Sequence, residues 1–147
     1  MQLTHLFDAE LWYVGEGAWA YDPLGAAGYG EGEGIVRGDR IRGSLRWSNR
    51  PRRRSDGAWL PDLCGFIRTL DGVAVLFTLR GVSLPESEPG ELRSVVCSLM
   101  FECPDESYRW LNPIVAAVEA RFDPVTGRMM ARAWECVNDL PVAVAPG

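Results

Sequence analysis

Apolar and polar residues alternate along several short stretches of this chain, with the period of two that is typical of a β-strand with one buried face. The alternation is strict at 40–47, where three arginines and a serine occupy the polar positions, and the β-rich run 73–82 has Thr78 and Arg80 between apolar residues. We therefore predict a half-buried strand in each stretch. The predicted inward residues are Ile41, Gly43, Leu45 and Trp47 in the first strand and Val73, Val75, Phe77 and Leu79 in the second.

Turn-forming residues separate such stretches at fairly regular intervals, in the manner of an all-β fold. The Leu-Asp-Gly sequence at 70–72 predicts a tight hairpin turn between β-rich runs at 58–68 and 73–82. We expect a further strand at 91–102. Glycines at alternate positions of 28–34 predict a tightly curved strand, because each lets the backbone bend, and their spacing is not that of a phosphate-binding loop.

The segment 112–121 allows two interpretations. Its Asn-Pro start and its alanines fit a helix. Its β-branched residues, and the turn at 123–127 that leads to the run 128–137, favour a strand in a last hairpin, which we predict. Roughly eight or nine antiparallel strands with little helix then favour a single closed β-barrel domain over 1–147, because closure removes exposed strand edges.

Two absences in the composition narrow the chemistry. All 15 basic residues are arginine, and the one histidine, His5, lies at a terminus that we expect to be frayed. Without lysine the chain cannot form a Schiff base, and a serine or cysteine nucleophile has no good histidine base. Any catalysis must therefore rest on Asp, Glu, Tyr or Cys.

The cysteines and the first residues bear on metal binding and location. Cys64, Cys97, Cys103 and Cys136 are scattered, with no C-x-x-C pair and no histidine nearby to complete a zinc site. Residues 1–8 lack both a basic start and a long apolar run, so neither a secretory signal nor a membrane span is expected. We therefore expect a cytoplasmic protein with free thiols, no metal, no cofactor and no membrane contact.

Several short motifs in the middle of the chain resemble those of one barrel family. They are an Arg-x-Asp-Gly turn at 54–57, Asp62, a Thr-x-Asp-Gly hairpin at 69–72, Phe101-Glu102, and Tyr-x-Trp-Leu-Asn at 108–112. Together they span about 28–137, and the set resembles domain-of-unknown-function family 3237, a group of bacterial proteins. The resemblance implies a calycin-like antiparallel barrel, and it supplies no established substrate, cofactor or catalytic residue.

Aromatic residues beside polar ones are the candidates for a binding site. The chain has six tryptophans, several of them close in sequence to Asn or Asp, and such groupings are the usual lining of a small-molecule pocket. The alternative is that these tryptophans are core residues that close one end of the barrel. The candidate ligand-binding residues are Trp47, Asn49, Arg54, Trp59, Asp62, Tyr108, Trp110 and Asn112.

Two carboxylates are candidate catalytic groups. Glu102 shares strand alternation with Val96 and is expected to face the apolar interior, where a carboxylate can serve as a general acid or base. An outward position, or a salt bridge to an arginine, is the alternative. Asp56 precedes Gly57 in a predicted turn, where it is either a second proton carrier or a structural residue that an arginine holds.

The arginines are concentrated in 37–54, which holds eight of the 15. This run allows a solvated surface, an anion clamp at the barrel mouth, or a nucleic-acid patch. The net charge of −5 and the outward placement of the arginines at 40–46 favour the solvated surface. We therefore predict no nucleic-acid partner.

Three functions fit these observations. The leading hypothesis is a small-molecule-binding barrel that acts as a cofactor-independent isomerase, cyclase or lyase on an apolar cyclic or aromatic metabolite, through carboxylate acid–base chemistry. The second is a non-catalytic carrier or sensor of such a metabolite. The third is a partner-binding structural module whose barrel is filled by side chains. A homodimer is compatible with each of them.

Overall fold

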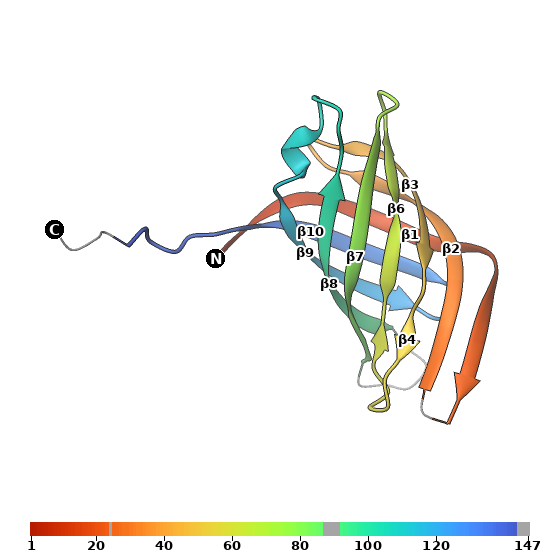
Figure 1. The fold of residues 1–147 in the computed structure, drawn as a ribbon. Helices are drawn as coiled ribbons and strands as arrows, with labels where there is room; N and C mark the ends of the chain where they lie inside the picture. The colour runs from red at the N-terminus through yellow and green to blue at the C-terminus, as the bar shows by residue number, and fades with distance from the viewer. Residues whose placement is uncertain (24, 87–91, 144–147) are drawn as a thin grey trace.

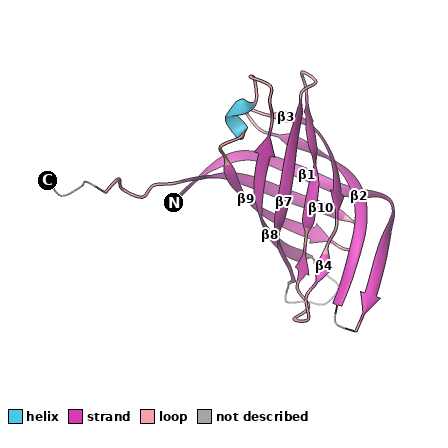
Figure 2. Ribbon diagram, in the orientation of Figure 1, coloured by secondary structure: helices cyan, strands magenta, loops and turns pink. Residues whose placement is uncertain are grey.

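The computed structural model describes residues 1–23, 25–86 and 92–143, and within them eight long strands close into one antiparallel barrel (Figures 1 and 2). The elements are β1 (Gln2–Asp22), β2 (Gly25–Arg37), β3 (Arg42–Asn49), β4 (Arg52–Arg53), β5 (Trp59–Leu60), β6 (Asp62–Thr69), β7 (Ala74–Pro85), β8 (Arg93–Glu102), the 3-10 turn η1 (Arg109–Leu111), β9 (Val115–Asp123) and β10 (Arg128–Val137). Around the barrel the order is β1, β2, β3, β6, β7, β8, β9, β10 and back to β1. The predicted all-β antiparallel barrel is confirmed. No helix in the described ranges is long and apolar enough to cross a membrane.

The short strands β4 and β5 extend one hairpin of the barrel. Asn49 lies opposite Leu63 in the β3–β6 pair, and the same register continues in the ribbon, where Arg53 lies opposite Trp59. Pro51 and Pro61 interrupt the two strands between these pairs, because proline has no N–H to donate to the ladder. The ribbon also pairs with β2 and with β7, so it continues the barrel wall.

The two ends of the barrel differ. At the closed end lie η1 and the turns at 38–41 and 70–72, and side chains such as Leu111 and Val75, both 0% exposed, fill the interior. The open end is formed by the tip of the β1–β2 hairpin, the β4–β5 ribbon and the turn at 124–127. In Figure 1 the closed end is at the top and the open end at the bottom. The core therefore occupies only part of the barrel.

Most of the predicted strands are observed. The segment 112–121 becomes β9 after η1, so the strand interpretation is right, and its Asn-Pro start marks the end of a 3-10 turn and not the start of a helix. The predicted hairpin turn at 70–72 joins β6 to β7. The predicted inward residues Ile41, Leu45, Trp47, Val75, Phe77 and Leu79 are buried, and Gly43 and Val73 are half-buried.

The N-terminal segment is an integral part of the wall, and the expectation that it is frayed is wrong. β1 pairs with both β10 and β2. His5 lies within β1, where its Nε2 is 3.0 Å from Oδ1 of Asp8 and its ring meets the edge of Trp134. Irregularities in register between His5 and Phe7 and between Val14 and Ala18 interrupt the period of two, which explains why the alternation was not visible in the sequence.

Alternate glycines of β2 make room for aromatic rings on neighbouring strands. A Cβ at Gly28 would collide with the ring of Trp19, and one at Gly32 would collide with the ring of Trp47. The indole of Trp47 is fixed in that place because its Nε1–H donates to the carbonyl of Glu33 at 3.0 Å. The glycines at 28–34 therefore lie in a barrel strand as predicted, and they also seat large side chains.

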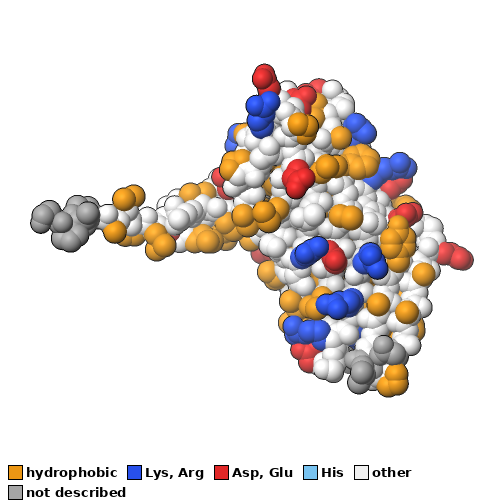
Figure 3. All heavy atoms as spheres, in the orientation of Figure 1, with side chains coloured by type: hydrophobic (Ala, Val, Ile, Leu, Met, Phe, Trp, Pro, Cys, Tyr) orange, Lys and Arg blue, Asp and Glu red, His pale blue; other side chains and the backbone are white. Residues whose placement is uncertain are grey.

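Charged side chains on the outer wall form pairs between strands. Two of these pairs join Arg132 to Asp8 at 2.8 Å and Arg80 to Asp62 at 2.9 Å. On the face in Figure 3, acidic side chains lie among the basic ones. This distribution agrees with the interpretation of the arginines as a solvated surface.

Candidate functional site

A cavity of about 610 Å³ lies at the open end of the barrel, and each of the eight long strands contributes to its lining. Its lining is mostly apolar and aromatic, from Leu11, Leu63 and Val95 in the barrel wall to the prolines at its rim. Ligand sites in proteins commonly have this size and composition. The cavity is therefore large enough for a small organic molecule.

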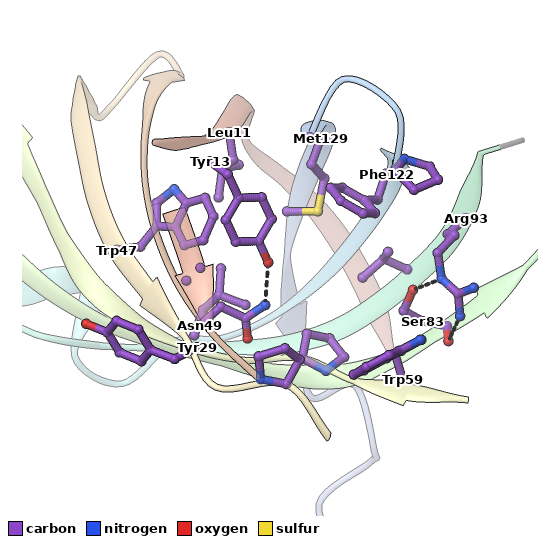
Figure 4. A pocket seen from close by; sticks show the side chains of 18 of the residues that line it. Leu11, Tyr13, Tyr29, Trp47, Asn49, Trp59, Ser83, Arg93, Phe122 and Met129 are labelled. Atoms are coloured by element: carbon purple, nitrogen blue, oxygen red, sulfur yellow. Dashed lines mark hydrogen bonds between the residues drawn. The ribbon is translucent and has the colours of Figure 1, made fainter. Parts of the chain in front are cut away.

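Aromatic rings dominate its walls (Figure 4). Tyr13 meets Trp47 edge to face, with ring centroids 4.8 Å apart, and meets Phe122 in the same way at 6.1 Å. Trp19, from the tip of the β1–β2 hairpin, meets Trp59 of the ribbon at 5.4 Å. Such edge-to-face pairs hold large flat surfaces in place, which suits contact with a flat apolar ligand.

Tyr13 and Asn49 form the first polar pair of the cavity. Asn49 is 6% exposed, and its amide is fixed at both ends: its oxygen accepts from the backbone N–H of Asp62 at 3.0 Å, and its Nδ2 donates to the Tyr13 hydroxyl at 2.8 Å. Burial raises the pKa of Tyr13, and the bond from Asn49 opposes this in part. The phenol therefore stays neutral at physiological pH.

Arg93 and Ser83 form the second polar pair. Nε of Arg93 donates to the Ser83 hydroxyl and Nη2 donates to the Ser83 carbonyl, both at 2.9 Å. Arg93 is half-buried and Ser83 is 7% exposed. Burial lowers the pKa of Arg93, which nevertheless stays charged. The guanidinium is thus held in one orientation at the edge of β7 and β8.

No carboxylate lines this cavity among the described residues, so the expectation of carboxylate acid–base chemistry loses its support there. Glu102 is exposed on the outer wall of the barrel, and its expected inward orientation is wrong. In β8 it is Val95 and Phe101 that face inward, whereas Val96 is 60% exposed. The error arose because both faces of β8 carry apolar residues, so hydrophobicity alone did not identify the inward face.

Asp56 and Arg54 lie in the turn between β4 and β5 and do not line the cavity. Nη2 of Arg54 is 2.6 Å from the Asp56 carboxylate, which also accepts from the backbone N–H of Ala58 at 3.1 Å. These two bonds hold the pKa of Asp56 below its usual value. Asp56 is therefore a paired, ionised turn residue, which is the structural role that the sequence allowed for it.

Asp62 lies on the outside of the wall, where it pairs with Arg80. It borders a second, smaller hollow of about 470 Å³ together with Arg50 and Arg52. This hollow lies apart from the aromatic cavity, with which it shares only Pro61 among its described lining residues.

Tyr108, Trp110 and Asn112 lie at the closed end, away from the cavity. The Tyr108 hydroxyl donates to the Asp71 carboxylate at 2.7 Å, which raises the pKa of Tyr108. Arg40 stacks on Trp110 at 3.6 Å, and the Asn112 amide bonds to the backbone of the residue that follows β8. These residues close the barrel, which is the second of the two roles considered for the tryptophans.

The structure thus brings together three of the eight predicted ligand-binding residues, Trp47, Asn49 and Trp59, and adds three polar residues that the sequence did not single out. Tyr13 was missed because β1 was not recognised as a strand. Arg93 was missed because it has the parity of Val95, and the inward face of this strand was assigned to the opposite parity. Ser83 could have been found, since it continues the inward parity of the predicted strand 73–82 by one step.

Solved structures with this fold come from several organisms. A β-barrel-like protein from Acinetobacter baumannii superposes with a TM-score of 0.80 at 17% identity, covering 91% of this chain and 94% of that one. A protein of unknown function from Rhodopseudomonas palustris gives 0.79 at 17% identity and covers 91% and 96%. An enzyme from Penicillium herquei gives 0.69 at 20% identity and covers 91% and 92%. At these identities the likeness shows a shared fold.

A scan of protein-family models and a search of curated proteins found no match to this sequence. The resemblance to domain-of-unknown-function family 3237 therefore stays a prediction. The structural neighbours agree with the barrel that this resemblance implies, and a description of function must come from the cavity itself.

Proposed function

We propose that this protein is a small-molecule-binding barrel whose open-end cavity takes an apolar cyclic or aromatic metabolite. The observation that carries the proposal is the cavity of about 610 Å³, walled by aromatic rings and furnished with two fixed polar pairs. A barrel filled by side chains, as in a purely structural module, would have no such space. The size and lining favour a ligand that buries most of its own surface.

The Tyr13 hydroxyl supplies a directional contact for that ligand. Its oxygen already accepts a hydrogen bond from Asn49, so its own hydrogen points elsewhere. None of the described residues accepts this hydrogen. A carbonyl or hydroxyl oxygen of the ligand can accept it, and the raised pKa keeps the proton on Tyr13. The same geometry favours a second candidate function, in which Tyr13 donates a proton in a cofactor-independent isomerisation, cyclisation or elimination.

A thermal-shift screen of cyclic and aromatic lactones, ketones and acids tests the proposal. A ligand at 100 times its Kd adds about 2.7 kcal/mol, which raises the Tm of a domain of this size by roughly 5–10 °C. Tyr13→Phe should weaken each oxygen-bearing hit, while Tyr21→Phe, outside the cavity, should not. Incubating each hit with the protein and analysing products by mass spectrometry separates an enzyme from a carrier. A screen without any hit would contradict the binding function.

A further inference from the structure

Arg93 is the one charged side chain among the described residues that line the cavity. Aspartate, glutamate and histidine are all absent from that described lining, and the chain has no lysine. The cavity of a protein with a net charge of −5 therefore carries a positive charge of its own. A purely apolar ligand would gain nothing from this charge, and would have to cover it at a cost in solvation.

The guanidinium of Arg93 is oriented but not neutralised. Its two bonds to Ser83 use Nε–H and one hydrogen of Nη2. The other Nη2 hydrogen and both Nη1 hydrogens remain, because a guanidinium has five donors. Within the described ranges no carboxylate lies within 4.0 Å of Arg93, whereas Arg80, Arg121 and Arg132 on the outer wall each have one within 3 Å.

We propose that the ligand is an organic anion, whose aromatic or alicyclic body fills the cavity and whose carboxylate binds Arg93. This inference rests on the proposed binding function and names its substrate class. A planar carboxylate matches the parallel N–H groups of a guanidinium, and such charge-assisted bonds are stronger than neutral ones. Because Ser83 holds the guanidinium in place, less side-chain freedom is lost when the anion binds.

The position of the two polar pairs refines this class. Figure 4 shows the Tyr13–Asn49 pair and the Arg93–Ser83 pair on different sides of the cavity, with Trp59 between them. A ligand that meets both pairs carries its carboxylate at one side and an oxygen acceptor at the other. The expected ligand is therefore a cyclic or aromatic acid with a keto or hydroxyl group away from its carboxylate.

Two fluorescent probes that differ by one charged group test the inference. N-phenyl-1-naphthylamine is neutral, and 1-anilinonaphthalene-8-sulfonate is the same molecule with a sulfonate; both become bright in apolar sites. We expect Arg93→Gln to lower the affinity for the sulfonate about tenfold and to change that for the neutral probe less than twofold. Added salt should weaken the binding of the sulfonate to the wild type and leave the affinity for the neutral probe unchanged.

Two further variants complete the design. Arg46→Gln makes the same charge change on the outer wall, where Arg46 is 71% exposed, and should leave both affinities unchanged. Arg93→Lys keeps the charge but lacks the paired donors of a guanidinium, so it should retain part of the affinity for the sulfonate. It also replaces Arg93→Gln in the experiment if the glutamine variant has a much lower Tm than the wild type. Equal changes for both probes, or none, would overturn the anion inference alone. Failure of both probes to bind the wild type would instead overturn the proposed function.

Discussion

The seating of aromatic rings on β2 glycines leads to a sharp prediction about stability. Gly28 and Gly32 lie on the same strand with the same parity, and each is covered by a tryptophan. A Cβ at Gly32 would meet the buried ring of Trp47 and also the backbone carbonyl of Trp12. The atoms nearest to a Cβ at Gly28 all belong to the ring of Trp19, which is 54% exposed and can shift towards solvent by giving up part of its contact with Trp59.

The same one-carbon change should therefore have different costs at the two positions. Overpacking in a core typically costs 1–3 kcal/mol, against which an added methyl returns roughly 0.4–1 kcal/mol by restricting the unfolded chain. At Gly32 neither Trp47, which is bonded to Glu33, nor a backbone carbonyl can move cheaply. We expect Gly32→Ala to lose about 2 kcal/mol and Gly28→Ala to stay within about 0.5 kcal/mol of wild type.

Urea unfolding followed by circular dichroism, with both variants measured beside the wild type, provides the free energies. For a domain of this size the loss at Gly32 corresponds to a fall in Tm of roughly 5–8 °C. Equal losses in the two variants, or a stable Gly32→Ala, would refute the idea that the glycine at 32 exists to seat Trp47.

Two other properties can be checked directly. Hydrogen bonds from Arg132 and His5 lower the pKa of Asp8 from 3.8 to about 2, so this carboxylate should stabilise the fold above about pH 4 and lose that effect as the pH falls towards 2. The difference in Tm between the wild type and Asp8→Asn should therefore shrink between pH 4 and pH 2. A Tm difference that stays constant over this range would contradict the prediction. Burial raises the pKa of Cys97 to about 12, so a thiol reagent at pH 8 should label the exposed Cys64 in native protein and Cys97 only after unfolding, as peptide mapping would show.

Periodicity predicted those strands in which one face is apolar and the other polar. β3 alternates strictly, and in β7 Thr78 and Arg80 mark the outer face, so the inward residues of both strands were identified correctly. β1 was missed because its irregularities shift the alternation, and the inward face of β8 was assigned wrongly because Val96 and Met100 are apolar and point outward. Where an outer wall carries apolar residues, pairing with neighbouring strands and not hydrophobicity decides which face is inside.

The site was predicted only where its residues are close in sequence. Trp47 and Asn49 lie in β3, and Trp59 follows a short way along the sequence in β5, so their grouping was visible. Trp110 was grouped with them although successive connections of an antiparallel barrel lie at alternate ends, which places 103–114 at the end opposite the β4–β5 turn. The three predicted strands between these connections, at 58–68, 73–82 and 91–102, would already have separated the two groups from the sequence alone.

The most direct test of the open-end cavity as the binding site is a titration of N-phenyl-1-naphthylamine into two variants of β8. Val95 is 4% exposed and lines the cavity, whereas its neighbour Val96 is 60% exposed on the outer wall. Val95→Phe should fill part of the cavity and reduce the affinity at least tenfold, while Val96→Phe should bind as the wild type does. Equal affinities in both variants, with both folded, would contradict the claim that the open end of the barrel is the binding site.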